Sequence, residues 1–320
     1  MDVLSDVLAV MRTGRPRSAL VAWQAPWAQE FAPVPGSAGF HVMLRGSGVL
    51  LRDGAEPVRL AEGDIVFRVH GDGHALADAA GTRPIAPACD PVTAGDPPRR
   101  AGAGDTVTLC GAYELDPALT HPLIRDLPDL VHIRSGREPR LAAVVDHLAA
   151  ELTEPGPGSD ALVPALLDTM LVHLLRTCLA GDHPTGWAAA LADPVTAAAL
   201  HAMHREPGRE WTVAALAAVG GLSRAPFARR FTTLLGRPPL TYLTWWRMTV
   251  AAGLLRRTDM TVGAVAGQVG YSSEFAFAAA FKRRFGEPPG RYRRVRAGRA
   301  PDRAAPGRRR PRRDPAPSTR

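Results

Sequence analysis

Residues 262–292 read VGAVAGQVGYSSEFAFAAAFKRRFGEPPGRY, and residues 212–242 align onto this stretch without a gap, at a constant offset of fifty positions. Eleven of the thirty-one aligned positions are identical, whereas composition alone would give roughly two or three. One folding unit therefore occurs twice near the C-terminal end of the sequence.

Each copy reads as a short helix, a tight turn and a longer helix. In the first copy a brief apolar face stops at Gly220-Gly221, because glycine supplies the backbone freedom that a sharp reversal needs. We expect Ser223 to cap the next helix, in which Phe227 and Phe231 recur at helical spacing before Gly236 ends it. The second copy follows the same plan, so both predict helix-turn-helix geometry.

Positive charge is concentrated around these units. Residues 191–297 hold sixteen Arg or Lys against six Asp or Glu, a net charge of +10, whereas residues 1–190 carry −8 and residues 298–320 carry +6. The cations on or beside the second helix of each unit are Arg224, Arg229, Arg230, Lys282, Arg283 and Arg284. This surplus is an electrostatic footprint for phosphate, so the units are expected to bind DNA.

An apolar helix, residues 238–255, is expected between the two units. About 18 residues at 1.5 Å each span roughly 27 Å. With side-chain reach, this length holds two reading helices near the roughly 34 Å that separates successive major grooves on one face of B-DNA. One chain is thus expected to straddle two grooves.

The second copy carries further specific residues: Gly270-Tyr271-Ser272-Ser273-Glu274, Phe277, the run AFKRRFG at 280–286, Pro289 and Tyr292-Arg293. On these residues, the stretch 191–296 resembles the DNA-binding domain of AraC/XylS-family transcription regulators. The resemblance implies that the third and sixth of seven helices enter adjacent major grooves. It places those helices at about 194–205, 213–219, 223–235, 238–255, 262–269, 273–285 and 288–295.

The two reading helices are expected to differ in their task. On the sixth helix Glu274, Phe275, Ala278 and Ala279 would face the groove, and alanine cannot make the bidentate hydrogen bonds that separate bases. We therefore expect base readout in the third helix, above all through Arg229, while the sixth positions the protein on phosphate. The residues predicted at DNA are Ser223, Arg224, Ala225, Ala228, Arg229, Ser272, Ser273, Glu274, Ala278, Ala279, Lys282 and Arg283.

The N-terminal region has a different texture. Between Gly39 and Ala77, short apolar stretches alternate with glycine-rich and Asp-rich turns, which predicts a run of β-hairpins in a small antiparallel barrel or jelly roll. The run Glu62-Gly63-Asp64, followed by His70-Gly71-Asp72-Gly73-His74, resembles the second cupin motif. The N-terminal half resembles the cupin sensor domains of one AraC subgroup, so the predicted fold class is α+β multidomain.

A cupin raises the question of a metal. His41 and His74, helped by His70, could bind a divalent ion such as zinc in a reduced site, although Met43 occupies the place of a second His from the first motif. The alternative interpretation is that these histidines line a pocket or form hydrogen bonds within the barrel.

Cys110 suggests a second sensing hypothesis, in which an accessible thiolate resolves against Cys89. Its apolar neighbours at 107–109 favour inert packing instead. Three cysteines, the third being Cys178, are too few for a disulfide scaffold and indicate a reducing, cytoplasmic setting.

Helical patterns follow the barrel. Apolar stripes in two segments separated by Pro155-Gly156-Pro157-Gly158 suggest a dimer interface, with packing against the barrel as the alternative. The predicted organisation is a cupin-like sensor domain at 1–135, a helical interface segment at 136–180, a linker at 181–190, an AraC-type DNA-binding domain at 191–297, and a disordered basic tail at 298–320.

The sequence therefore predicts a transcription regulator and not an enzyme: a small molecule, metal or oxidant acting on the cupin-like domain would modulate promoter binding. The alternative function is a metal-dependent cupin enzyme fused to a DNA-binding module. The predicted partners are double-stranded promoter DNA, RNA polymerase, a small effector and a second copy in a homodimer, with no membrane. The sequence does not decide the effector, the target promoters, or activation against repression.

Overall fold

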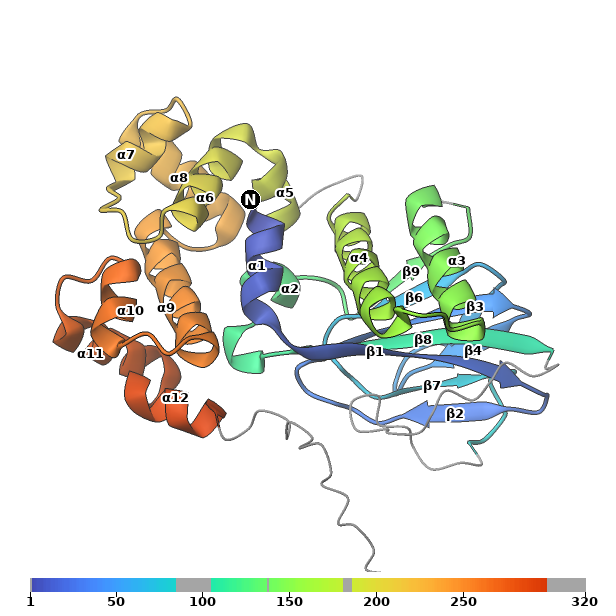
Figure 1. Cartoon of the computed structure of the whole chain (residues 1–320). Helices are drawn as coiled ribbons and strands as arrows, with labels where there is room; N and C mark the ends of the chain where they lie inside the picture. The colour runs from blue at the N-terminus through green and yellow to red at the C-terminus, as the bar shows by residue number, and fades with distance from the viewer. Residues whose placement is uncertain (1, 85–104, 137, 181–185, 298–320) are drawn as a thin grey trace, which may run out of the picture.

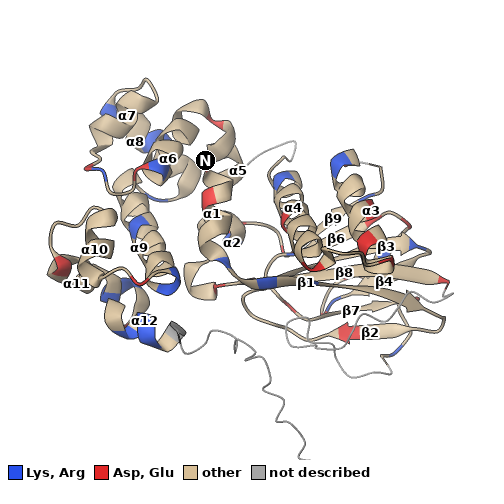
Figure 2. Cartoon of the chain, viewed as in Figure 1, with Lys and Arg blue, Asp and Glu red and all other residues tan. Residues whose placement is uncertain are grey.

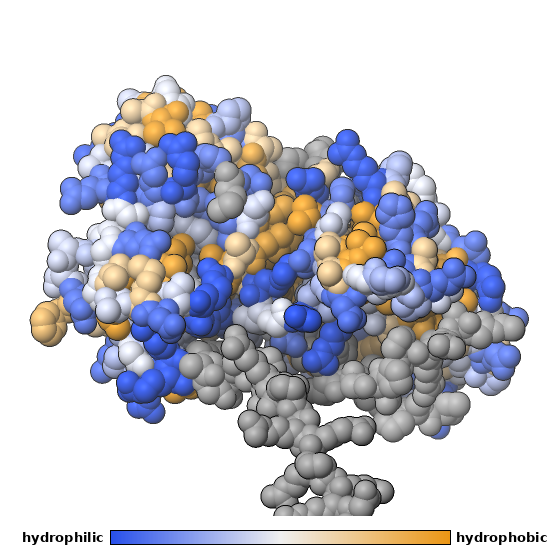
Figure 3. Space-filling model, in the orientation of Figure 1, coloured by the Kyte–Doolittle hydropathy of each residue, from blue (hydrophilic) through white to orange (hydrophobic). Residues whose placement is uncertain are grey.

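The computed structural model describes residues 2–84, 105–136, 138–180 and 186–297. A strand-rich N-terminal domain and a helical C-terminal domain lie side by side, and the first helix, α1 (Val3–Met11), sits where they meet (Figure 1). A hollow between the domains exposes apolar side chains (Figure 3).

The N-terminal domain consists of two antiparallel sheets. One has the strand order β1-β8-β3-β6-β9 and the other β2-β7-β4-β5. The strands are β1 (Arg12–Trp23), β2 (Ala28–Phe31), β3 (Ser37–Arg45), β4 (Gly48–Leu51), β5 (Val58–Leu60), β6 (Ile65–Arg68), β7 (His74–Ala77), β8 (Thr106–Leu115) and β9 (Leu130–Ile133). The predicted antiparallel cupin architecture is confirmed.

Alternation along the strands gives the five-stranded sheet two buried faces. Phe40, Val42 and Phe67 belong to a large core that includes the helices packed outside the barrel. Met43 and Val66 point the other way, into a separate cluster between the two sheets. His41, which shares the orientation of Met43, therefore faces the barrel interior.

Two helices cover the outer face of the five-stranded sheet. Helix α3 (Pro139–Thr153) packs on α4 (Ser159–Leu179), and both contact β1 (Figure 1). Among the described residues, α4 is the one helix whose length and apolar composition would suit a membrane span. Met170 and Leu174 on this helix are fully buried against the rest of the protein. The packing against the barrel that we weighed is thus observed, whereas the homodimer stays a prediction.

The C-terminal domain contains all seven helices predicted from the sequence, with ends within two residues of those expected. They are α6 (Pro194–Arg205), α7 (Val213–Val219), α8 (Arg224–Leu235), α9 (Pro239–Arg257), α10 (Val262–Gln268), α11 (Glu274–Phe285) and α12 (Pro289–Ala297). An additional helix, α5 (Gly186–Ala192), occupies the second half of the stretch predicted as a linker. Its Trp187 is buried, so this half belongs to the folded domain.

The second helices of the two helix-turn-helix units, α8 and α11, are capped in nearly the same way. Gly236 and Gly286 both adopt a left-handed conformation at the C-terminal caps of α8 and α11. Ser273 caps α11 by accepting a hydrogen bond from the backbone N–H of Ala276. Ser223 is the N-cap residue of α8, as predicted, but its side chain makes no capping hydrogen bond.

Candidate DNA-binding surface and barrel interior

The first unit presents one face of α8 to solvent. Phe227 and Phe231 are completely buried and anchor the helix on its domain. Arg224, Ala225 and Arg229, on other faces of the helix, are exposed. Of the remaining residues predicted at DNA on this unit, Ser223 is exposed and Ala228 is half-buried.

The second unit repeats this arrangement with different chemistry. Phe277 and Phe281 are buried, while Ser272, Ser273, Glu274, Ala279, Lys282 and Arg283 are exposed and Ala278 is half-buried. Phe275, which the sequence placed toward the groove, has 90% of its surface exposed. A single exposed apolar side chain does not by itself mark an interface, so a contact of Phe275 with DNA stays a prediction.

Two cations of the predicted footprint have partners inside the protein. Arg230 forms an ion pair with Asp193, the residue that caps α6. Arg284 donates from Nη2 to the carbonyl of Ala118 in the N-terminal domain, at 3.2 Å. The expectation that they serve phosphate as the other cations do is therefore corrected. The cations of the footprint that remain are Arg224 and Arg229 on α8 and Lys282 and Arg283 on α11. Further basic residues lie on α9 and α12 (Figure 2).

Arginines of α9 hold the two domains together. Arg256 pairs with Asp116 and also donates to the carbonyl of Val10, at 3.0 Å. Arg257 donates to the carbonyl of Ala9. The acceptors lie on α1 and directly after β8, so these contacts reach the barrel strands without an intervening flexible segment.

A buried hydrogen-bonded chain crosses the same boundary. The backbone N–H of Leu123 donates to Nδ1 of His121, which leaves the proton of this neutral ring on Nε2, 3.1 Å from the Tyr242 hydroxyl. Tyr242 in turn donates to Nε2 of His204, whose Nδ1 lies 3.5 Å from Asp6. Burial lowers the pKa of His121 and of His204, which keeps both rings neutral.

The barrel interior brings together three residues predicted as sensor groups. Nε2 of His41 lies 2.6 Å from Nε2 of His74, and Nδ1 of His41 lies 3.0 Å from Sγ of Cys110. Nδ1 of His74 donates to the carbonyl of Asp72, so Nε2 of His74 accepts from His41, and Nδ1 of His41 accepts from the thiol. Phe31 stacks on His74 at 4.9 Å between ring centroids.

The described residues do not complete a metal site, so His41 and His74 as metal ligands stay a prediction. No group of three His, Cys, Asp or Glu side chains suited to an ion occurs among the residues that the structure describes. His70 turns away, with Nε2 3.0 Å from the carbonyl of Leu127. Two histidines whose facing nitrogens share one proton supply too few donors for zinc. The alternative that we weighed, histidines bonded within the barrel, describes the geometry.

The structure describes only one of the two cysteines in the redox hypothesis. Cys110 is half-buried beside His41, and Cys89 lies outside the described residues. A thiol that donates a hydrogen bond to an imidazole can lose its proton to become a thiolate. Redox sensing by Cys110 and Cys89 stays a prediction.

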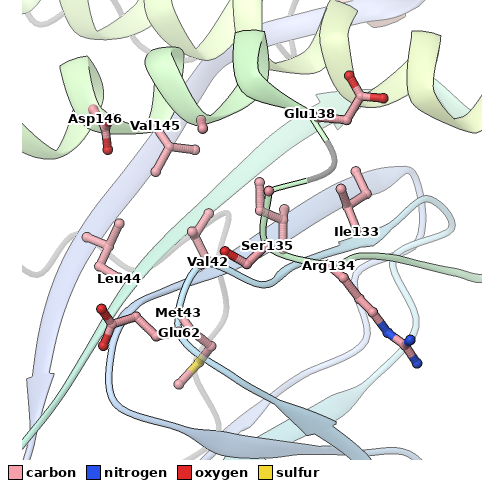
Figure 4. Close-up of a pocket in the computed structure, with 14 residues that line it drawn as sticks. Val42, Met43, Leu44, Glu62, Ile133, Arg134, Ser135, Glu138, Val145 and Asp146 are labelled. Carbon is pink, nitrogen blue, oxygen red and sulfur yellow. The ribbon is translucent and has the colours of Figure 1, made fainter.

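A separate cavity of about 300 Å³ lies between the five-stranded sheet and α3. Val42 and Leu44 point into it from β3, and Val145 faces them from α3 (Figure 4). Arg134 and Glu138 point away from it (Figure 4). Glu62, Ser135 and Asp146 also line it, and we assign it no ligand.

Comparison with known proteins agrees with this geometry. A family model described as Cupin matches residues 2–180, and one described as Helix-turn-helix domain matches residues 216–295. An AraC-like transcription regulator of Streptomyces lividans is 39% identical over 301 residues, which cover 92% of this chain and 98% of that protein. The chain belongs to the AraC family of transcription regulators.

This AraC-family chain is also similar to the regulator AlkR of Acinetobacter baylyi, with 30% identity over 307 residues, 92% of this chain and 99% of that protein. The crystal structure of the DNA-binding domain of AdpA in complex with a target DNA is 34% identical; the match covers 34% of this chain and 98% of that one, with a TM-score of 0.32. The predicted family and fold class are confirmed, and DNA binding is the shared activity.

Several residues of this AraC-family protein escaped sequence reasoning. Asp116 pairs with Arg256 and His121 with Tyr242; the partners are 140 and 121 residues apart in the sequence and meet only at the domain boundary. Arg68 is buried in the barrel interior. A charged residue in an otherwise apolar strand, IVFR at 65–68, was the available signal for it.

Proposed function

We propose that the cupin domain of this regulator senses a small molecule and thereby alters how the two helix-turn-helix units engage a promoter. The proposal rests on one observation: the contacts between the two domains are made by segments that continue directly from barrel strands. Asp116 directly follows β8, and Met11 at the end of α1 runs directly into β1. Both segments contact α9 through Arg256.

This arrangement supplies a direct physical connection. β1 pairs with β8 along most of its length, so a change in strand position at the barrel would move α1 and Asp116 together. The contact on α9 would move with them, and α9 is the helix that sets the distance between the two units. A conformational change in the cupin domain would thus change the distance between α8 and α11.

On the DNA side, we propose that α8 reads bases and α11 mainly holds phosphate. Support comes from exposure and chemistry: Arg224 and Arg229 on α8 can form bidentate hydrogen bonds with guanine. Lys282 and Arg283 on α11, and Ser272 just before its N-cap, suit phosphate oxygens. RNA polymerase and a second copy of the chain belong to the proposal as partners at the promoter, and the cytoplasm as the compartment.

A gel shift of the full chain against the DNA flanking its own gene tests this function. We expect specific retardation that survives excess unrelated DNA, and a change in affinity when the Asp116 and Arg256 contact is removed. Turnover of a small metabolite without any DNA preference would instead favour the alternative, a cupin enzyme joined to a DNA-binding module.

A further inference from the structure

Arg68 lies in the barrel interior with open hydrogen-bonding capacity. It ends β6, two positions after Val66 on the same face of the strand, and only 4% of its surface is exposed. Its Nε and Nη1 atoms are buried and have no hydrogen-bond partner among the described residues. The nearest carboxylate, Asp72, is 3.6 Å from Nη2 and is itself 58% exposed.

The neighbours of Arg68 add positive charge and little side-chain bulk. Arg68 pairs across the sheet with Gly39, which has no side chain; an added Cβ there would meet the carbonyl oxygen of Gly111 at 3.3 Å, a tight contact. Nε of Arg52, the residue after β4, is also buried without a partner in the described part of the chain. Burial, with the charge of Arg68 as a further cause, lowers the pKa of His41, and that of His74 to about 4.

A buried guanidinium without acceptors is costly, because each open donor has lost its hydrogen bonds to water. Within the same interior, Trp23 and Trp27 stack at 4.9 Å between ring centroids, and Phe31 packs on His74. The site thus offers cationic donors at one end and an aromatic wall at the other. A divalent cation is disfavoured there, and an anion with an apolar body is favoured.

We propose that the barrel interior binds a small organic carboxylate, with Arg68 as its charge partner and the aromatic side chains around its apolar body. A monoanion suits the site better than a dianionic phosphate, because Asp72 and Asp129 already offset part of the positive charge at Arg68. The inference rests on the sensor role proposed above and names the chemical class that the sensor recognises.

Titration of the full chain with acetate, hexanoate and benzoate tests the site, with chloride at equal ionic strength as the reference and hexanamide, benzamide and inorganic phosphate as comparison ligands. The readouts are the melting temperature and tryptophan fluorescence. At least one carboxylate should raise the melting temperature by several degrees in a saturable manner, and its amide should not.

Arg68→Met should reduce the carboxylate affinity at least tenfold while leaving the melting temperature of the ligand-free chain unchanged or higher, because open buried donors are removed. Arg59→Met, on an exposed position of β5, is the matched control and should change neither quantity. The proposal is overturned if no carboxylate stabilises the chain, if the stabilisation survives Arg68→Met, if phosphate or the amide acts as well, or if Arg68→Met unfolds the ligand-free protein. A parallel gel shift separates the outcomes: specific DNA retardation without carboxylate binding rejects this site and keeps the regulator.

Discussion

Asp116 and Arg256 form an ion pair across the domain boundary, although 140 residues separate them in the sequence. Their side chains are 2% and 12% exposed, so the pair is screened from solvent. Asp116 directly follows β8, and Arg256 belongs to α9, the helix between the two DNA-binding units. This pair is therefore a direct physical link between sensor and reader.

Removal of one partner of this pair should destabilise the protein. Arg256→Met leaves the Asp116 carboxylate buried without its cation, and we expect a loss of about 3 kcal/mol in the free energy of unfolding. The double variant with Asp116→Asn should recover at least about 1 kcal/mol of this loss. Urea unfolding of the two single variants and the double variant measures the coupling, and strictly additive effects would show that the pair does not interact.

Stability should fall as the pH drops below about 6.5, through the buried histidines. The pKa of His74 in the folded protein is about 4, well below the value of 6.5 for an unperturbed His, so the unfolded chain binds the proton first. The contribution of His74 to the free energy of unfolding is fully present above pH 6.5. It is lost between pH 6.5 and 4, by roughly 3 kcal/mol for this one residue.

His74→Gln should flatten this pH dependence, whereas His147→Gln, on an exposed position of α3, should leave it unchanged. Urea unfolding at pH 7.5, 6, 5 and 4.5 is the measurement. An identical slope in wild type and His74→Gln would contradict the assignment.

The two reading helices should respond differently to substitution. Arg229→Ala should cost about 1–3 kcal/mol at the operator and little on scrambled DNA, because a base contact is lost. Ala279→Arg should leave base preference unchanged if α11 only positions the protein. Quantitative gel shifts on both DNAs decide this, and equal losses on the two DNAs for Arg229→Ala would end the proposed division of roles.

Neighbouring cations of α11 should separate into two classes. Lys282→Met should lower the salt dependence of binding by about one phosphate contact, a change of roughly 0.9 in the slope of log affinity against log salt. Arg284→Met should not change that slope, because the guanidinium of Arg284 already donates to the carbonyl of Ala118. Binding measured at 50, 100 and 200 mM salt checks this, and a reduced slope for Arg284→Met would contradict the observed contact.

Local patterns made most of the fold predictable. The spacing of Phe227 and Phe231, the terminating Gly236 and their repetition fifty residues later define both helix-turn-helix units, since helix periodicity and capping act within a few residues. The hairpins of the barrel follow from similar short-range signals. The capping bond of Ser223 was expected and is absent, because residue type alone does not fix the orientation of a side chain.

The sites could be predicted only where the chemistry is local. His41, His74 and Cys110 were singled out and do meet inside the barrel, but their hydrogen-bond directions, which argue against a metal, depend on strand register. Arg284 looked like a phosphate contact until the packing of the two domains gave it another acceptor. Contacts of this kind depend on tertiary placement, which sequence periodicity does not encode.

Hydroxyl-radical footprinting of the full chain on its own operator tests the central claim most directly, since α8 and α11 are held by α9, a helix of 19 residues. We predict two protected patches on one face of the DNA, with centres about 10–10.5 base pairs apart. A single patch confined to one groove would contradict the account of two docking units in one chain.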